Sequence, residues 1–251
     1  MRRLRSPTEE GTTLTLQVVE YACDGVQLTG HLALPAGGGD LPAVLVAHEA
    51  SGMNDNIQSR TLALAERGYA AFALDMYGVD GVSRAESNEL VTRLMETPGL
   101  LVNRAKAALA ALAALPSVDP SRMGAIGFCL GGVVALELAR VGSPIKCAVG
   151  FHPGYVRPRG SPGDPISAKV LMMSGSADPF ATEDLRAQFA AEMTSKDADW
   201  QLHLFGGVGH TFTDPAIDAL ELPGFGYDAD ADRRSWAMML ALLEECLGSP
   251  Q

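Results

Sequence analysis

Short, continuous apolar runs recur along this chain and alternate with segments of helical composition. The first run is Ala43-Val44-Leu45-Val46-Ala47, and similar runs follow at 70–74, 123–128, 147–151, 170–173 and 200–205. A strand is apolar at every position only when both of its faces are buried. Such strands, alternating with helices, form a parallel sheet that is covered by helices on both faces. The chain is therefore expected to be an α/β protein.

The segments between these runs have the length and periodicity of helices. They are predicted at 57–67, 83–95, 102–115, 132–141, 182–193 and about 230–247. Before the first buried run, residues 14–21 and 26–34 alternate between apolar and polar side chains across an Asp24-Gly25 turn. This pattern predicts two antiparallel strands at one edge of the sheet.

Length and composition favour a single domain. The chain has 251 residues, of which 47% are hydrophobic and 20% charged, and no shift in composition divides it. We expect one domain over residues 11–251, preceded by a flexible tail at 1–10. No apolar segment follows the basic start Met1-Arg2-Arg3, and no run of about 18 apolar residues occurs. Neither a signal peptide nor a membrane span is predicted, and a cytoplasmic location is expected.

Charge and cysteine usage exclude several classes of function. A net charge of -11 disfavours nucleic acids and anionic membranes as partners. The cysteines show neither the density of a disulfide scaffold nor the spacing of a zinc site; they are Cys23, Cys129, Cys147 and Cys246. No phosphate-binding glycine motif is present, and the acidic cluster at 228–232 lacks the glycine and final glutamate of a calcium loop. No metal and no cofactor are predicted.

The most specific motif is Gly127-Phe128-Cys129-Leu130-Gly131-Gly132, between a predicted strand and a predicted helix. In such a strand–turn–helix, the middle residue is exposed at the top of the sheet, and side chains at 127 and 131 would collide across the turn. The helix N-terminus also favours a thiolate. A lone cysteine is more often a buried core residue, but this context favours a nucleophile at Cys129.

Two further polar residues follow later predicted strands. Asp178 ends the loop after the run at 170–173, and His210 lies in a glycine-rich loop after the run at 200–205. Each residue alone has an ordinary structural explanation, as a turn aspartate and as a loop-bracing histidine. The order nucleophile, acid, histidine is that of an α/β-hydrolase triad. Cys129, Asp178 and His210 are therefore the predicted catalytic residues.

With these motifs, the chain resembles the dienelactone hydrolase family, single-domain α/β hydrolases that have a cysteine nucleophile in a G-x-C-x-G-G turn. The resemblance extends from the strand at Ala43 through Gly127–Gly132, Asp178 and Gly209-His210-Thr211-Phe212 to the last helix. It implies an α/β-hydrolase fold and cleavage of an ester or lactone through a thioester. The partner is then a small-molecule substrate; oligomeric state is not indicated.

The resemblance also assigns roles around the nucleophile. It implies that Glu49, in His48-Glu49-Ala50, interacts with the resting thiol until substrate releases the thiol toward His210. Such a switch would protect the cysteine from oxidation. An oxyanion hole needs two fixed N–H donors, expected here from the backbone of Leu130 and Ala50. His48 is expected to brace its loop.

The chain departs from the family pattern where the founding members bind a substrate carboxylate with two arginines. Val79 occupies the position two residues beyond Tyr77, and Asp214 the position four residues beyond His210. A desolvated carboxylate without a cation is costly, and Arg84 is expected to be a solvated surface residue. We therefore expect a neutral or weakly polar substrate rather than dienelactone, in a pocket lined by Tyr77, Val79, Phe212 and Asp214.

Alternatives remain open from the sequence. A thioesterase or a peptidase-like acyl hydrolase would use the same three residues. A non-catalytic protein could instead bind a ligand or sense redox state through Cys129. A substrate panel would distinguish these possibilities.

Overall fold

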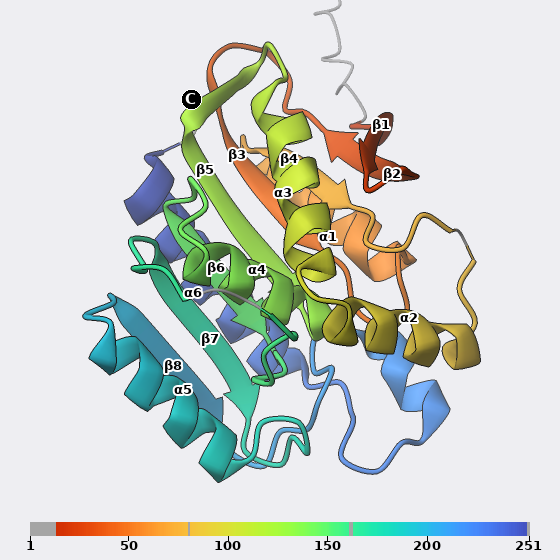
Figure 1. The fold of residues 1–251 in the computed structure, drawn as a ribbon, viewed down its shortest axis with the longest axis vertical. Coiled ribbons are helices and arrows are strands. Elements are labelled where there is room, and N and C mark those ends of the chain that lie inside the picture. Colours follow the sequence, from red (N-terminus) through yellow and green to blue (C-terminus); the bar gives the residue numbers. More distant parts are fainter. Residues whose placement is uncertain (1–13, 80, 161–162, 250–251) are drawn as a thin grey trace, which may run out of the picture.

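The computed structural model describes residues 14–79, 81–160 and 163–249, so the tail expected at 1–10 lies outside the described residues. The described strands form an eight-stranded sheet in the order β1-β2-β4-β3-β5-β6-β7-β8 (Figure 1). Their bounds are β1 Gln17–Cys23, β2 Val26–Ala33, β3 Leu41–Ala47, β4 Ala70–Leu74, β5 Val118–Phe128, β6 Cys147–Phe151, β7 Lys169–Gly175 and β8 Trp200–Phe205.

The sheet has the expected pattern of pairing. Strands β3 to β8 pair in parallel, whereas β1 pairs antiparallel with β2, and β2 pairs antiparallel with β4. The largest difference from the prediction is in β5, which begins at Val118 instead of Met123, whereas the ends of the other strands lie within three residues of the expected ones. The added segment is polar and contains Pro120, so it carries no apolar signal, and its register against β3 shifts there.

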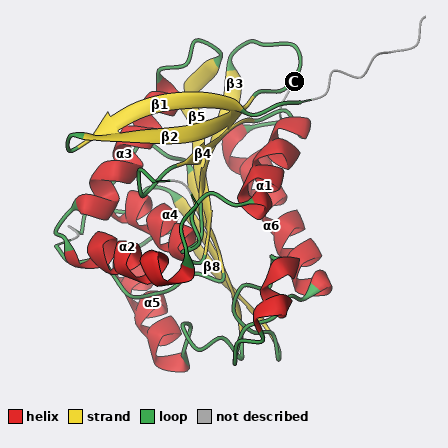
Figure 2. Cartoon of the chain, turned by 90° about the vertical axis from the view of Figure 1, so that its right-hand side faces the viewer, coloured by secondary structure: helices red, strands yellow, loops and turns green. Residues whose placement is uncertain are grey.

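Helices cover both faces of the sheet (Figure 2). Each predicted helix is present, and its ends lie within two residues of the expected ones. The helices are α1 Asp55–Glu66, α2 Arg84–Glu96, α3 Leu100–Ala113, α4 Leu130–Arg140, α5 Glu183–Ser195 and α6 Ala229–Leu247, with a 3-10 helix η1 at Pro215–Leu220. No helix within the described ranges has both the length and the apolar composition needed to traverse a bilayer.

Two separate apolar cores follow from this layering. On one face, β-strand side chains pack with α1 and α6, through residues such as Leu64 and Leu243. On the other face they pack with α2 to α5, through residues such as Leu109 and Phe189. Every residue of α4 is buried, which suits a helix that is apolar nearly all round. The N-terminus of α4 is thereby held firmly at the end of the central strand β5.

Candidate active site

The predicted catalytic residues meet at the edge where the parallel strands end. Glu49 follows β3, Cys129 follows β5, Asp178 follows β7 and His210 follows β8. Carboxyl ends of parallel strands in an α/β sheet lie at one edge, where ligands commonly bind. Residues far apart in the sequence are thus brought to one place by the topology alone.

Glycine makes the turn at Cys129 possible. A Cβ on Gly127 would lie 2.0 Å from the carbonyl oxygen of Gly131, and a Cβ on Gly131 would lie 2.0 Å from the carbonyl oxygen of Ala47. Cys129 itself has a φ of 51°, a conformation that is strained for a non-glycine residue. It directly precedes α4, as its N-cap residue, and its side chain is half-buried. The thiol thus lies at a helix N-terminus.

Among the three predicted catalytic residues, His210 is within hydrogen-bonding distance of both others. Nε2 of His210 lies 3.1 Å from Sγ of Cys129, and Nδ1 lies 2.8 Å from Oδ2 of Asp178. The other oxygen of Asp178 accepts a hydrogen bond of 2.8 Å from the backbone N–H of Phe180. Because an ionised carboxylate only accepts, Nδ1 of His210 carries the proton and Nε2 faces the sulfur.

Electrostatics favour a charged imidazole at His210. Burial lowers the pKa of His210, but the negative charges of Cys129 and Asp178, and hydrogen bonds to both, raise it to about 10. An imidazolium beside a thiolate is the arrangement that activates a cysteine nucleophile.

The histidine loop is held by its own backbone. The N–H of His210 donates to the carbonyl of Gly224 at 2.7 Å, and the N–H of Gly226 donates to the carbonyl of His210 at 3.1 Å. The chain packs so closely here that a Cβ on Gly209 would lie 2.6 Å from the Gly224 oxygen. This close approach explains the glycine that directly precedes the histidine in the sequence.

The two expected oxyanion donors are placed differently. Leu130 is the first residue of α4, so its N–H is one of those with no partner within the helix. The N–H of Ala50 belongs to the same peptide unit as the carbonyl of Glu49, so the hydrogen bonds of that carbonyl fix its orientation. This oxygen accepts from Nδ1 of His48 at 2.6 Å and from the N–H of Gly52 at 3.0 Å. Because the peptide is planar and trans, the Ala50 N–H points the opposite way.

His48 braces its loop. Its Nδ1 donates to the Glu49 carbonyl, and its Nε2 accepts a 3.1 Å hydrogen bond from the N–H of Met76. Both ring nitrogens are used, and burial lowers the pKa of His48. The ring is therefore a neutral link between the loops that follow β3 and β4.

Glu49 is buried, but its hydrogen bond is not with the thiol. Its Oε1 accepts from Nδ2 of Asn56 at 3.3 Å, whereas Sγ of Cys129 is hydrogen-bonded to His210. Burial, followed by the negative charge of Asp214, raises the pKa of the Glu49 carboxyl to about 7. The hydrogen bond from Asn56 opposes this increase.

The four residues expected to line the pocket differ in exposure. Tyr77 is buried, and its hydroxyl donates to the Ala50 carbonyl at 2.9 Å. Phe212 is also buried, and its ring packs edge-on against Phe205. Val79 is 54% exposed. Asp214 is half-buried, and it caps η1 by accepting from Ala216 N–H. Arg84 is exposed, as expected.

Three aromatic rings around His210 were missed by the sequence reasoning. The ring centroid of Phe180 lies 4.9 Å from that of His210, that of Phe225 lies 5.0 Å away, and that of His152 lies 5.2 Å away. His152 directly follows β6, so its place at a strand end was a signal that could have identified it. The pKa of His152 is lowered well below its ordinary value by burial and by the charge of His210.

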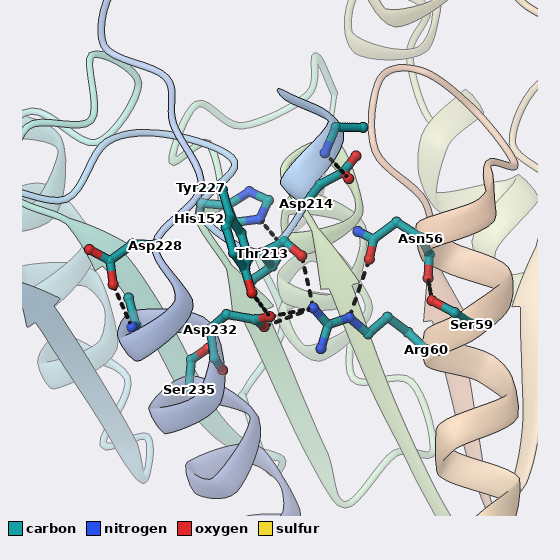
Figure 3. Close-up of polar contacts among 12 residues, drawn as sticks. Asn56, Ser59, Arg60, His152, Thr213, Asp214, Tyr227, Asp228, Asp232 and Ser235 are labelled. Carbon is teal, nitrogen blue, oxygen red and sulfur yellow. Dashed lines mark hydrogen bonds and ion pairs between the residues drawn. The ribbon is translucent and has the colours of Figure 1, made fainter. Parts of the chain in front are cut away.

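A half-buried arginine close to this cluster was also missed. Arg60 of α1 pairs with Asp232 of α6 at 2.8 Å and donates to the backbone carbonyl of Thr213 at 2.8 Å (Figure 3). The acidic cluster that contains Asp232 thus begins α6, with Asp228 as the N-cap residue. Within the described part of the chain, no cluster of three or more acidic, histidine or cysteine side chains could hold a metal ion.

Sequence comparison identifies the family. The family model described as "Dienelactone hydrolase family" matches residues 28–247. A carboxymethylenebutenolidase from Pseudomonas sp. is 29% identical over 198 residues, which cover 75% of this chain and 80% of that protein. A Bradyrhizobium protein named "Probable 2-oxo-3-(5-oxofuran-2-ylidene)propanoate lactonase" is 28% identical over 220 residues, which cover 82% of this chain and 88% of that protein.

Solved structures agree with this result. A dienelactone hydrolase-like promiscuous phosphotriesterase from metagenomic libraries has a TM-score of 0.86 at 35% identity, and the match covers 94% of this chain and 99% of that one. A Klebsiella pneumoniae protein described as "Putative Dienelactone Hydrolase", at 23% identity and a TM-score of 0.71, shows the same fold over 93% of this chain and 100% of that one. The chain has the α/β-hydrolase fold, belongs to the dienelactone hydrolase family and is an enzyme that hydrolyses ester or lactone bonds.

Proposed function

We propose that Cys129, His210 and Asp178 form a catalytic triad that cleaves its substrate through a thioester acyl-enzyme. The observation that carries this proposal is the pair of contacts on one imidazole. Its Nε2 lies 3.1 Å from Sγ of Cys129, and its Nδ1 lies 2.8 Å from the Asp178 carboxylate. The nucleophile therefore contacts the base, and the base contacts the acid that orients it, as nucleophilic catalysis requires.

The first half of the reaction forms the thioester. Sγ of Cys129 attacks the carbonyl carbon, and the developing oxyanion is stabilised by the N–H groups of Leu130 and Ala50. The proton of the thiol resides on Nε2 of His210, while Asp178 stabilises the imidazolium. When the tetrahedral intermediate collapses, the carbon–oxygen ester bond breaks and Nε2 gives its proton to the leaving alkoxide. In a lactone, the alcohol formed remains attached to the acyl group.

The second half regenerates the thiol. A water molecule loses a proton to Nε2 of His210 as its oxygen attacks the thioester carbon. The carbon–sulfur bond breaks, the product leaves as a carboxylic acid, and the proton returns to Cys129. The same two backbone donors stabilise the second oxyanion.

The charges around the site support a neutral or weakly polar substrate. Val79 and Asp214 stand where the family pattern has arginines, and Glu49 adds a further acid close by. Large apolar side chains are exposed in the loops after the strands: Val79 after β4, Val156 after β6 and Phe180 after β7. An ester with apolar substituents can bury them against such surfaces, whereas a free carboxylate would have no cationic partner at the two family positions.

The nucleophile can be tested by substitution. Cys129→Ala should abolish hydrolysis of p-nitrophenyl acetate, and the wild-type protein should show a Cys129-linked acyl adduct by mass spectrometry. Cys23→Ala is the matched control, because Cys23 is another free, half-buried cysteine. Wild-type turnover in Cys129→Ala would show that this assignment is wrong.

A panel of substrates tests the alternatives. Acyl thioesters and aminoacyl amides test thioesterase and peptidase-like activity, and a phosphotriester is included because a similar protein is described as a promiscuous phosphotriesterase. A redox-sensing protein would turn over none of these compounds and would oxidise Cys129 reversibly. The four free thiols support a reducing compartment, such as the cytoplasm, as the place of the reaction.

A further inference from the structure

Arg60 contacts both Asn56, the hydrogen-bond partner of Glu49, and the loop that carries His210. Its Nη2 donates to both carboxylate oxygens of Asp232 and to the carbonyl of Thr213, each at 2.8 Å. Its Nε donates to Oδ1 of Asn56 at 3.3 Å (Figure 3). The guanidinium carbon lies 5.1 Å from the ring centroid of Trp236. One planar side chain therefore joins α1, α6 and the loop that carries His210.

On one side, these contacts reach His210. Thr213 is three residues beyond His210, and its backbone carbonyl is held by Arg60. The hydroxyl of Thr213 is hydrogen-bonded to Nε2 of His152 at 2.8 Å, and the ring of His152 meets His210 edge-on. His152 has a φ of 38°, and Thr211, which directly follows His210, has a φ of 58°, so the backbone at both positions is strained and must be held by its surroundings.

On the other side, the contacts reach Glu49. Because Arg60 donates to the amide oxygen of Asn56, the NH₂ group of Asn56 is turned toward the carboxyl group of Glu49, to which it donates at 3.3 Å. If Arg60 were absent, the amide could reverse and present its oxygen to Glu49.

The ion pair between Arg60 and Asp232 is a weak source of stability. The two side chains are only 16% and 13% exposed. Removing two charges from water offsets much of their attraction, so such pairs often contribute little to stability. A guanidinium does, however, fix several acceptors in a rigid plane, which a lysine ammonium cannot do. Fixing the positions of its hydrogen-bond acceptors is therefore a better explanation for the position of Arg60 than a contribution to stability.

We propose that Arg60, anchored by Asp232, is a positioning residue that holds both His210, the partner of Cys129, and Glu49 in place. This inference rests on the proposed function, since it assigns Arg60 a part in the same site. Arg60 acts through Thr213 and Asn56 and itself meets neither the sulfur nor the substrate.

The electrostatics around Glu49 provide a second readout. The groups that face its carboxyl group are Asp214 before η1, His210 after β8, and Asn56 and Arg60 on α1. Burial and Asp214 raise the pKa of Glu49, and Asn56, His210 and Arg60 lower it. Loss of the Arg60 charge should therefore keep Glu49 protonated to a higher pH.

The experiment compares Arg60→Lys, Arg60→Gln and Asp232→Asn with Arg67→Gln, which removes an exposed arginine at the end of the same helix. For each full-length protein, kcat and KM are measured with p-nitrophenyl acetate, thermal stability is recorded, and iodoacetamide alkylation of Cys129 is followed against pH by mass spectrometry. Arg60→Lys retains the charge without the planar fork, so it separates geometry from charge.

We expect both Arg60 variants to lose roughly 10- to 100-fold in kcat, with KM within about threefold of wild type. In Arg60→Gln, the change in alkylation rate that accompanies the ionisation of Glu49 should also move to higher pH, and Arg67→Gln should match wild type. Asp232→Asn should show a smaller loss of the same kind, and it tests the proposal if the Arg60 variants do not fold.

Wild-type kcat and a wild-type alkylation profile in folded Arg60→Lys and Arg60→Gln would overturn the proposal. A change confined to KM would also overturn it, since that would indicate direct contact with substrate. If Cys129→Ala remained active, the proposed function would fail, whereas the alkylation profile would still decide whether Arg60 positions the groups around this thiol.

Discussion

The ring of Phe180 lies 4.9 Å from the ring of His210, and half of its surface is exposed. Phe225 packs edge-on against both rings, so an apolar wall stands beside the imidazole that faces Cys129. An exposed phenyl ring next to the proposed catalytic base is a surface on which the apolar part of a substrate can be buried.

Phe180→Ala should therefore lower kcat/KM roughly tenfold for phenyl or long-chain alkyl esters. For acetate esters, kcat/KM should stay within about threefold of the wild-type value. The substitution retains the backbone N–H that donates to Asp178, so the proposed triad is left intact. Val18→Ala is the control, since Val18 is 64% exposed on the opposite edge strand, β1. An equal loss for all esters would argue against a role in substrate selection.

Asp178→Asn should reduce kcat by about 10³- to 10⁴-fold, with little effect on KM. The amide NH₂ that replaces Oδ2 would donate to Nδ1 of His210, so the ring proton would move to Nε2. Nε2 could then no longer accept the proton of Cys129. Steady-state kinetics of the variant and of Asp184→Asn, an exposed acid on α5, would test this prediction.

Glu49→Gln should stabilise the protein at pH 8 more than at pH 5. Folding raises the pKa of this carboxyl from 4.5 to about 7, so the folded state binds the proton more tightly than the unfolded chain. Stability from this group is fully present below pH 4.5 and is lost as the pH rises toward 7, by up to about 3 kcal/mol. The neutral amide introduced by Glu49→Gln does not ionise, so the variant does not lose this stability as the pH rises.

Urea unfolding at the two pH values measures the effect, with Glu66→Gln, at the exposed end of α1, as the control. Equal stabilisation of Glu49→Gln at pH 5 and pH 8 would mean that the carboxyl of Glu49 is not perturbed by folding.

Gly131→Ala should destabilise the fold by more than about 3 kcal/mol. Its Cβ would lie 2.0 Å from the carbonyl oxygen of Ala47, a backbone atom in the central strand β3 that cannot easily move. Gly206→Ala is the matched control, because a Cβ there meets no atom within 4 Å. Thermal unfolding of both variants checks the difference; similar melting temperatures would show that the turn can relax.

Much of the fold was predictable because the signals that specify it are local. A buried parallel strand is recognisable from five consecutive apolar residues, as at Cys147–Phe151, which the structure places in β6. The tight turn at Cys129 is recognisable from the glycines on either side of it. Strand ends then place the candidate residues at one edge without any knowledge of side-chain contacts.

The sequence by itself determined the layered α/β architecture and the three candidate catalytic positions, because strand and helix periodicity and turn glycines act over a few residues. Tertiary structure decided which other side chains meet them. Arg60 and Asp232 pair across 172 residues, and Phe180 and Phe225 approach His210 from separate loops. Such contacts depend on loop paths and side-chain directions, for which a single sequence carries no periodic signal.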